Sequence, residues 1–190
     1  MIIDSSLLSD ASKGFQSYFD RLKSETDNLI KQIYFFVNDS YLKDKLKGEG
    51  WNTVRKYMHS YISILEKLKV VCDTLSNNIV SANNSVIVAM GGYSTIDLNE
   101  IYVLKDKKND LQNEIDRISG FWYRLFKSKE KNEQIDSTIQ SYYSIIGEIN
   151  NKLCIFENTK EAYENAKSIV SNDLDIMVTQ FSSEISKNGR

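Results

Sequence analysis

The sequence contains no proline in 190 residues and only 8 glycines. At the average usage of about 5%, a chain of this length would carry roughly nine prolines. Because proline and glycine punctuate loops, their scarcity leaves few and long secondary-structure elements, and helices are the elements that grow long. The composition therefore argues against an all-β sandwich or barrel and against a loop-rich disulfide scaffold.

Residues that carry catalysis or bind metals are also scarce. The chain has two cysteines, Cys72 and Cys154, and one histidine, His59, and none of them belongs to a spaced motif. We interpret the cysteines as small buried apolar residues, with a disulfide left open, and His59 as a surface or helix-packing residue. There is no zinc-type spacing, no glycine-rich phosphate loop and no Glu-x-x-His pair. We therefore expect no enzyme activity, no metal and no cofactor.

Charge and hydropathy bear on two further classes. The chain has 24 basic and 26 acidic residues, a net charge of -2 and no basic block, so we expect no nucleic-acid partner. No apolar run reaches the roughly 18 residues that a membrane helix needs. The first ten residues lack the basic and apolar regions of a signal peptide. We expect a chain that is soluble when made, has no membrane span and, if exported, leaves without a cleavable signal.

Most of the chain carries apolar residues at three- and four-residue steps, the spacing that places them on one face of a helix. The first such stripe predicts a helix of about 25 to 30 residues that ends near Asn38–Ser40. A short helical segment is expected over 41–47. After the Gly48-Glu49-Gly50 break, a second stripe from Trp51 to Ile79 predicts the most regular helix of the chain.

Two further helices are expected in the second half. Asp97 can cap the third helix, with Glu100 as its capping-box partner three residues on. The last stripe runs from Ile135 to Ile185 without a proline. It predicts either one helix of up to about 55 residues or two helices separated by a turn near Asn158–Thr159.

Residues 77–95 differ from their flanks, since Asn and Ser surround the short β-branched run Val86–Val88 and the segment ends in two glycines. This composition favours a loop or strands. The predicted fold is therefore all-α: an elongated bundle of three to four long antiparallel helices with a short non-helical, strand-like insertion near residues 82–95. We expect one domain over residues 1–190. Because the aromatic residues 34–36 are consecutive and cannot all face one neighbour, we also expect another chain to complete part of the apolar surface.

The segment from Leu46 to Tyr57 carries the most recognisable motif. Leu46, Lys47 and Gly48 form a Leu-x-Gly triplet, Trp51 enters a helix, and a Lys-Tyr pair and an apolar stripe follow. The triplet lies about 45 residues into the chain, after one amphipathic helix. This segment resembles the region that defines LXG domains, the N-terminal parts of polymorphic toxins of Gram-positive bacteria. The rest of the chain resembles the family as a pattern of long helices.

The resemblance implies a non-catalytic targeting function in interbacterial competition. LXG domains carry their toxins to the type VIIb (Esx-like) secretion machine and its ATPase, and small helical partner proteins related to the Trp-x-Gly family bind beside them. A protein of this kind is cytoplasmic before export and secreted afterwards. No toxin domain is expected within these residues, so the chain is either the targeting domain of a longer toxin or a stand-alone relative.

Seven residues are candidates for this function. Leu46, Gly48 and Trp51 are expected to form the turn. The simpler interpretation, that Leu46 packs and Gly48 ends a helix as its C-cap, can hold at the same time. Aromatic residues of the first helix are expected to face the partner: Phe15, Phe19, Tyr34 and Phe36. Two alternatives remain open. One is an α-helical pore-forming toxin with Val86–Met90 as its inserting tip, and the other is a self-associating coiled-coil scaffold.

Overall fold

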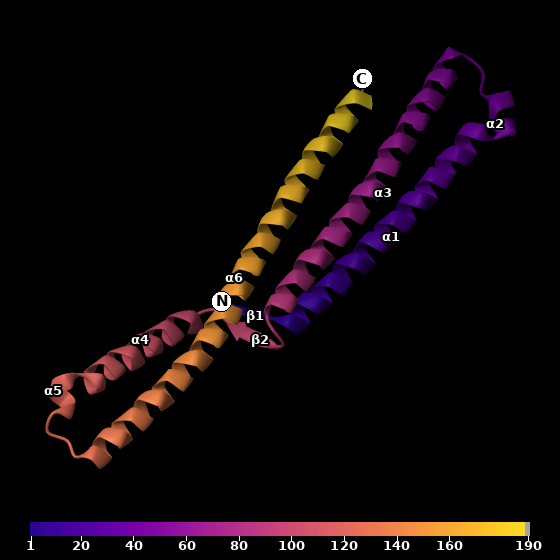
Figure 1. The fold of residues 1–190 in the computed structure, drawn as a ribbon. Helices are drawn as coiled ribbons and strands as arrows, with labels where there is room; N and C mark the ends of the chain where they lie inside the picture. Colours follow the sequence, from indigo (N-terminus) through magenta and orange to yellow (C-terminus); the bar gives the residue numbers. More distant parts are fainter. Residues whose placement is uncertain (189–190) are drawn as a thin grey trace. The chain divides into compact units, whose positions relative to one another are not determined.

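The structure is a computed structural model that describes residues 1–188, and it is almost entirely helical (Figure 1). The all-α class predicted from the sequence is confirmed. The elements in chain order are β1 (Ile2–Asp4), α1 (Ser5–Asn38), α2 (Ser40–Lys45), α3 (Glu49–Ala89), β2 (Thr95–Asp97), α4 (Glu100–Ser119), α5 (Phe121–Arg124) and α6 (Lys129–Asn188).

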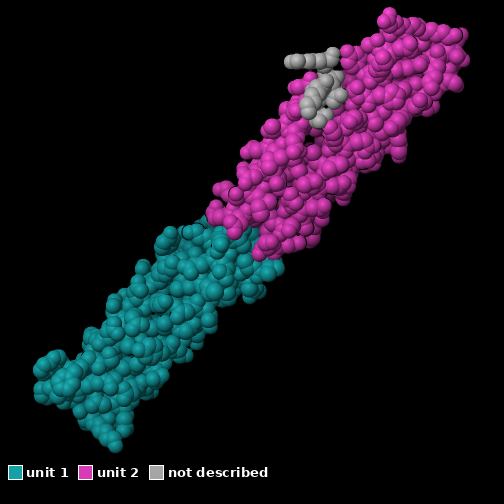
Figure 2. All heavy atoms as spheres, turned by 45° about the horizontal axis from the view of Figure 1, so that its top comes forward, with its two compact units in different colours: residues 1–6, 86–162 teal, residues 7–85, 163–190 magenta. Residues whose placement is uncertain are grey.

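The chain divides into two compact units (Figure 2). Unit 1 contains residues 1–6 and 86–162, and unit 2 contains residues 7–85 and the chain from Tyr163 onward. The boundaries fall inside the continuous helices α1, α3 and α6 rather than in loops. For this reason no change of composition marks them, and the sequence suggested a single domain.

Unit 2 is built on an antiparallel pair of long helices, α1 and α3. The register is fixed by contacts between residues whose numbers rise on α1 as they fall on α3, from the Lys23–Asp73 ion pair to the Tyr34–His59 ring contact. The second half of α6 runs along α3, where the Asn78 side-chain amide donates to Asp173. The buried core of this unit is mostly aliphatic and includes Ile30, Val37, Ile62, Cys72, Leu75 and Ile79.

Unit 1 joins a small sheet to a pair of helices. β1 and β2 pair antiparallel, with Ile3 opposite Ile96, and both of these side chains are buried. The α4 helix packs against the first half of α6 through a cluster of buried isoleucines, Ile115, Ile118, Ile139 and Ile146. The sequence did not predict β1, which has only three residues and a partner more than 90 positions away.

The non-helical insertion is shorter than predicted, because α3 continues to Ala89. Ala82, Val86 and Met90 are spaced four residues apart and all are buried. Burial of this face overrides the β propensity of the Val-Ile-Val run. The helix ends at Gly91 and Gly92, whose positive φ angles of 57° and 90° suit glycine. In this part of the chain, strand structure begins at β2, at Thr95.

The structure decides between the two alternatives for the last helix and corrects the predicted start of α4. The α6 helix is continuous through residues 158–159, and the buried Thr159 hydroxyl donates to the Ile155 carbonyl, as a helical threonine does. The predicted cap of α4 is wrong: α4 begins at Glu100, while the Asp97 carboxylate accepts from the Asn99 amide and pairs with the terminal ammonium. Asp97 does not occupy the cap position because it is part of β2, and Asn99 occupies that position instead.

Candidate functional site

Leu46 and Gly48 lie in the connection between α2 and α3, and Trp51 lies in the first turn of α3. Leu46 caps α2 in an extended conformation, and its amide donates to the Leu42 carbonyl at 2.9 Å. Gly48 has a φ of 120°, a conformation that L residues rarely adopt, and no atom lies within 4 Å of the position its Cβ would take. Its carbonyl accepts from the Asn52 amide, which opens α3. Gly48 therefore serves the backbone of the turn and not a close approach of helices.

Trp51 connects this turn to α1. Its ring packs edge-on against Phe36, with 5.2 Å between centroids, and the Arg55 guanidinium lies 5.5 Å from its centroid. Three donors at this place, Trp51 Nε1 and Arg55 Nε and Nη2, are buried and have no acceptor within the described residues. Each unsatisfied buried donor costs on the order of 1–3 kcal/mol. The turn is thus folded but has unused hydrogen-bonding capacity.

The four aromatic residues chosen on α1 fall into two pairs. Phe15 and Phe19 stack on one another with centroids 6.4 Å apart, Phe15 being exposed and Phe19 half-buried. Tyr34 is exposed and contacts His59 across the helix pair, whereas Phe36 is half-buried against Trp51. Phe36 and Trp51 therefore belong to one contact, and Phe15 and Phe19 form a separate one along α1.

A surface on α3 was missed by the sequence analysis, because its residues belong to the stripe that forms the core. Val54, Tyr57, Tyr61, Ile64, Leu68, Leu75 and Ile79 follow the alternating three- and four-residue spacing of one helix face. At its C-terminal end this face is covered, and Leu75 is only 7% exposed. At its N-terminal end Val54, Tyr57 and Tyr61 are 39%, 46% and 57% exposed. We call these three residues the open segment of α3.

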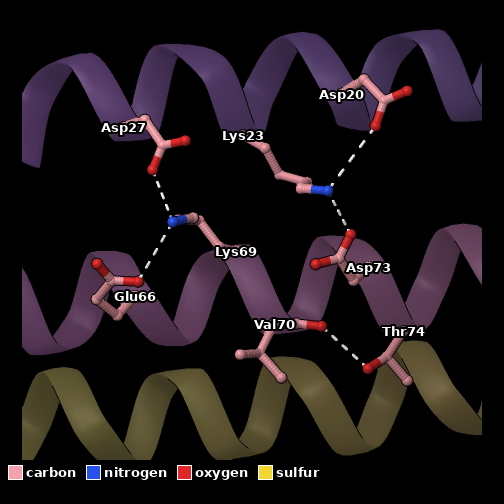
Figure 3. A network of polar contacts seen from close by, with 8 residues as sticks. All are labelled: Asp20, Lys23, Asp27, Glu66, Lys69, Val70, Asp73 and Thr74. Carbon is pink, nitrogen blue, oxygen red and sulfur yellow. Dashed lines mark hydrogen bonds and ion pairs between the residues drawn. The ribbon is translucent and has the colours of Figure 1, made fainter.

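Ion pairs fix the register of α1 against α3 in the middle of unit 2 (Figure 3). The Lys69 ammonium lies between Asp27, at 2.6 Å, and Glu66, and the Lys23 ammonium lies between Asp73 and Asp20. The hydrogen bond from Lys69 lowers the pKa of the Asp27 carboxyl, and that from Lys23 to Asp73 raises the pKa of the lysine. All these groups are solvent-accessible, and they act as alignment contacts between the two helices.

Among residues 1–188 there is no group of three His, Cys, Asp or Glu side chains able to hold a metal ion. An open groove of about 510 Å³ lies in unit 2 between α3 and α6, lined by Lys67, Val70, Val71, Thr179, Gln180, Phe181 and Ser183. Both cysteines are free thiols, and the prediction that they are buried is confirmed for Cys72 and wrong for Cys154, which is exposed. Within the same residues, no helix combines the length and apolar character of a membrane span.

Comparison with known proteins adds no relative: no family model, no curated protein and no solved structure matches the chain. The resemblance to LXG domains therefore rests on the Leu46–Tyr57 segment and on the helical pattern around it.

Proposed function

We propose that this chain is a non-catalytic targeting domain of an antibacterial toxin exported by a type VIIb system, and that it binds small helical partner proteins before export. The observation that carries the proposal is the open segment of α3. A single apolar face is buried against its own chain at one end and exposed at the other. An amphipathic helix that packs lengthwise on such a face completes the same spacing of apolar contacts.

The neighbouring turn supports the same site. The unsatisfied donors of Trp51 and Arg55 belong to the first turns of α3, one helical turn from Val54 and Tyr57. A partner helix placed there brings backbone carbonyls or carboxylates that can accept from these donors once the side chains adjust. Tyr34 and Phe36 lie on the α1 side of this region through their contacts with His59 and Trp51. In this proposal the Leu-x-Gly turn orients α3 for the partner, and Phe15 and Phe19 extend the contact along α1.

The test is co-expression of the chain with the small helical proteins encoded beside its gene, followed by affinity purification and measurement of the dissociation constant. Tyr57→Ala with Tyr61→Ala removes two aromatic rings from the open segment. Burial of one such side chain contributes roughly 1.5–3 kcal/mol, so we expect affinity to fall at least tenfold. Secretion into the medium by a type VIIb-positive host should fall in parallel.

A matched control uses two tyrosines that are similarly exposed but lie in unit 1, Tyr102 on α4 and Tyr143 on α6. Tyr102→Ala with Tyr143→Ala should leave partner affinity and secretion unchanged. Equal losses in the two double variants, or no loss with the α3 variant, would reject the open segment as the partner site. A chain that binds none of these proteins and is not secreted would reject the proposed function.

A further inference from the structure

The segment that joins α4 to α6 has an unusual concentration of exposed apolar side chains. Phe121, Trp122 and Phe126 are 68%, 78% and 89% exposed, and Leu125 is also exposed. These residues include the 4-residue helix α5 and the turn after it. We call residues 120–131 the aromatic turn. It lies at the far end of the α4–α6 pair within unit 1 (Figure 1).

The aromatic turn is held in place by contacts with α4 and α6. The exposure of its apolar side chains is therefore a property of a folded segment. Tyr123, between the exposed residues, packs on the isoleucine cluster of α4 and α6. Arg124 donates to the Ile118 carbonyl and to Asp136, the latter at 2.6 Å. The Lys127 amide donates to the Arg124 carbonyl, and the side chain of Asn132 donates to the Lys127 carbonyl. One tyrosine faces inward while its four apolar neighbours face solvent.

The charge of this region differs from that of the chain. The aromatic turn contains four basic residues and one acidic residue, Glu130, whereas the whole chain has a net charge of -2. Arg117 and Arg124 are paired with Glu114 and Asp136. For Lys127, Lys129 and Lys131, the described residues provide no carboxylate within ion-pair distance. Three lysines that form no ion pair within the described residues therefore flank the exposed rings, and the Lys127 ammonium also lies 4.5 Å from the centroid of the Tyr123 ring.

We propose that the aromatic turn docks on the surface of an anionic phospholipid bilayer. Trp and Phe side chains partition to the membrane interface, and adjacent lysines bind acidic headgroups, which is the combination present here. The segment is too short to present the repeated three- and four-residue spacing that a partner helix requires, in contrast to the open segment of α3. Phe121, Trp122, Leu125 and Phe126 enter the interface, and the three lysines contact the headgroups. This site is independent of the partner-binding function proposed above.

The experiment is flotation of the full chain with vesicles of phosphatidylcholine alone or with 30% phosphatidylglycerol. We expect binding to the anionic vesicles, at least tenfold weaker binding to the neutral ones, and loss at high salt. Trp122→Ala with Phe126→Ala should weaken anionic binding at least tenfold. Replacing the three lysines by glutamine should remove the preference for anionic vesicles.

The matched control is Tyr102→Ala with Val103→Ala, two exposed apolar residues of α4 in the same unit. This variant should float as the original chain does, and far-UV circular dichroism should show that all variants remain helical. As a second measurement, brominated lipids should quench the fluorescence of Trp122 in a Trp51→Phe chain. The vesicles should retain an encapsulated dye, since docking makes no pore.

Several results would overturn the proposal. They are absence of flotation, equal flotation with both lipid compositions, equal effects of the test and control variants, and no quenching of Trp122. Self-association that depends on Trp122 and Phe126 without vesicle binding would instead identify a second copy of the chain as the occupant. Loss of a protein partner in the same variants, again without vesicle binding, would identify a protein surface.

Discussion

The apolar face of α3 should contribute to stability at one end only. Leu75 is 7% exposed, and Leu75→Ala removes about three buried carbon groups worth roughly 0.8 kcal/mol each. With the cavity left behind, the loss of unfolding free energy should be about 3 kcal/mol. Tyr61, on the same face, is 57% exposed, so less than half of its side chain contributes and Tyr61→Ala should cost about 1 kcal/mol or less.

Urea unfolding followed by circular dichroism at 222 nm measures this difference. With a slope of about 2 kcal/mol per molar urea, Leu75→Ala should lower the midpoint by about 1.5 M and Tyr61→Ala by less than about 0.5 M. Equal midpoints would refute the reasoning, because they would mean that the open segment of α3 is covered in solution. Repeating the titration at two protein concentrations would then show whether a second copy covers it.

Two further predictions concern the turn and the thiols. Gly48→Ala should lower the unfolding free energy by about 1–2 kcal/mol, because an L residue at a φ of 120° is strained even though no atom obstructs its Cβ. Gly14→Ala, in the middle of α1 and equally unobstructed, should instead raise the unfolding free energy by up to about 1 kcal/mol. Thermal unfolding of the two variants measures this difference. A thiol reagent such as DTNB should label Cys154 rapidly and Cys72 only in denaturant. Burial excludes the reagent from Cys72 and raises the pKa of its thiol, which leaves less reactive thiolate at neutral pH. Two equally fast labelling phases would contradict the burial of Cys72.

The helices were predictable because their signal is local. A helix face repeats every three to four residues, so the stripes of α1, α3 and α6 appear in the sequence without knowledge of their neighbours. The end of α3 was not predictable in this way. Val86 has a strand-forming side chain, and only its burial in unit 1 makes the helical conformation favourable there.

The candidate surfaces were harder to predict for a related reason. Tyr57 and Leu75 occupy equivalent places in one stripe, and only the structure shows that Leu75 is covered and Tyr57 is exposed. Phe121 and Trp122 likewise continue the pattern of the third helix, but Gly120 adopts extended backbone angles and ends α4 before them. Their side chains therefore leave the face of α4 that buries Ile115 and Ile118. Spacing predicts which residues share a helix face, whereas exposure depends on where the neighbouring helices end.

The composition of the two units restricts how this protein can change over evolution. Each unit draws on two stretches of sequence separated by part of the other. A single contiguous gene fragment that encodes all of one unit must also carry residues of the other, so recombination cannot transplant either alone. The two units are therefore expected to be inherited together.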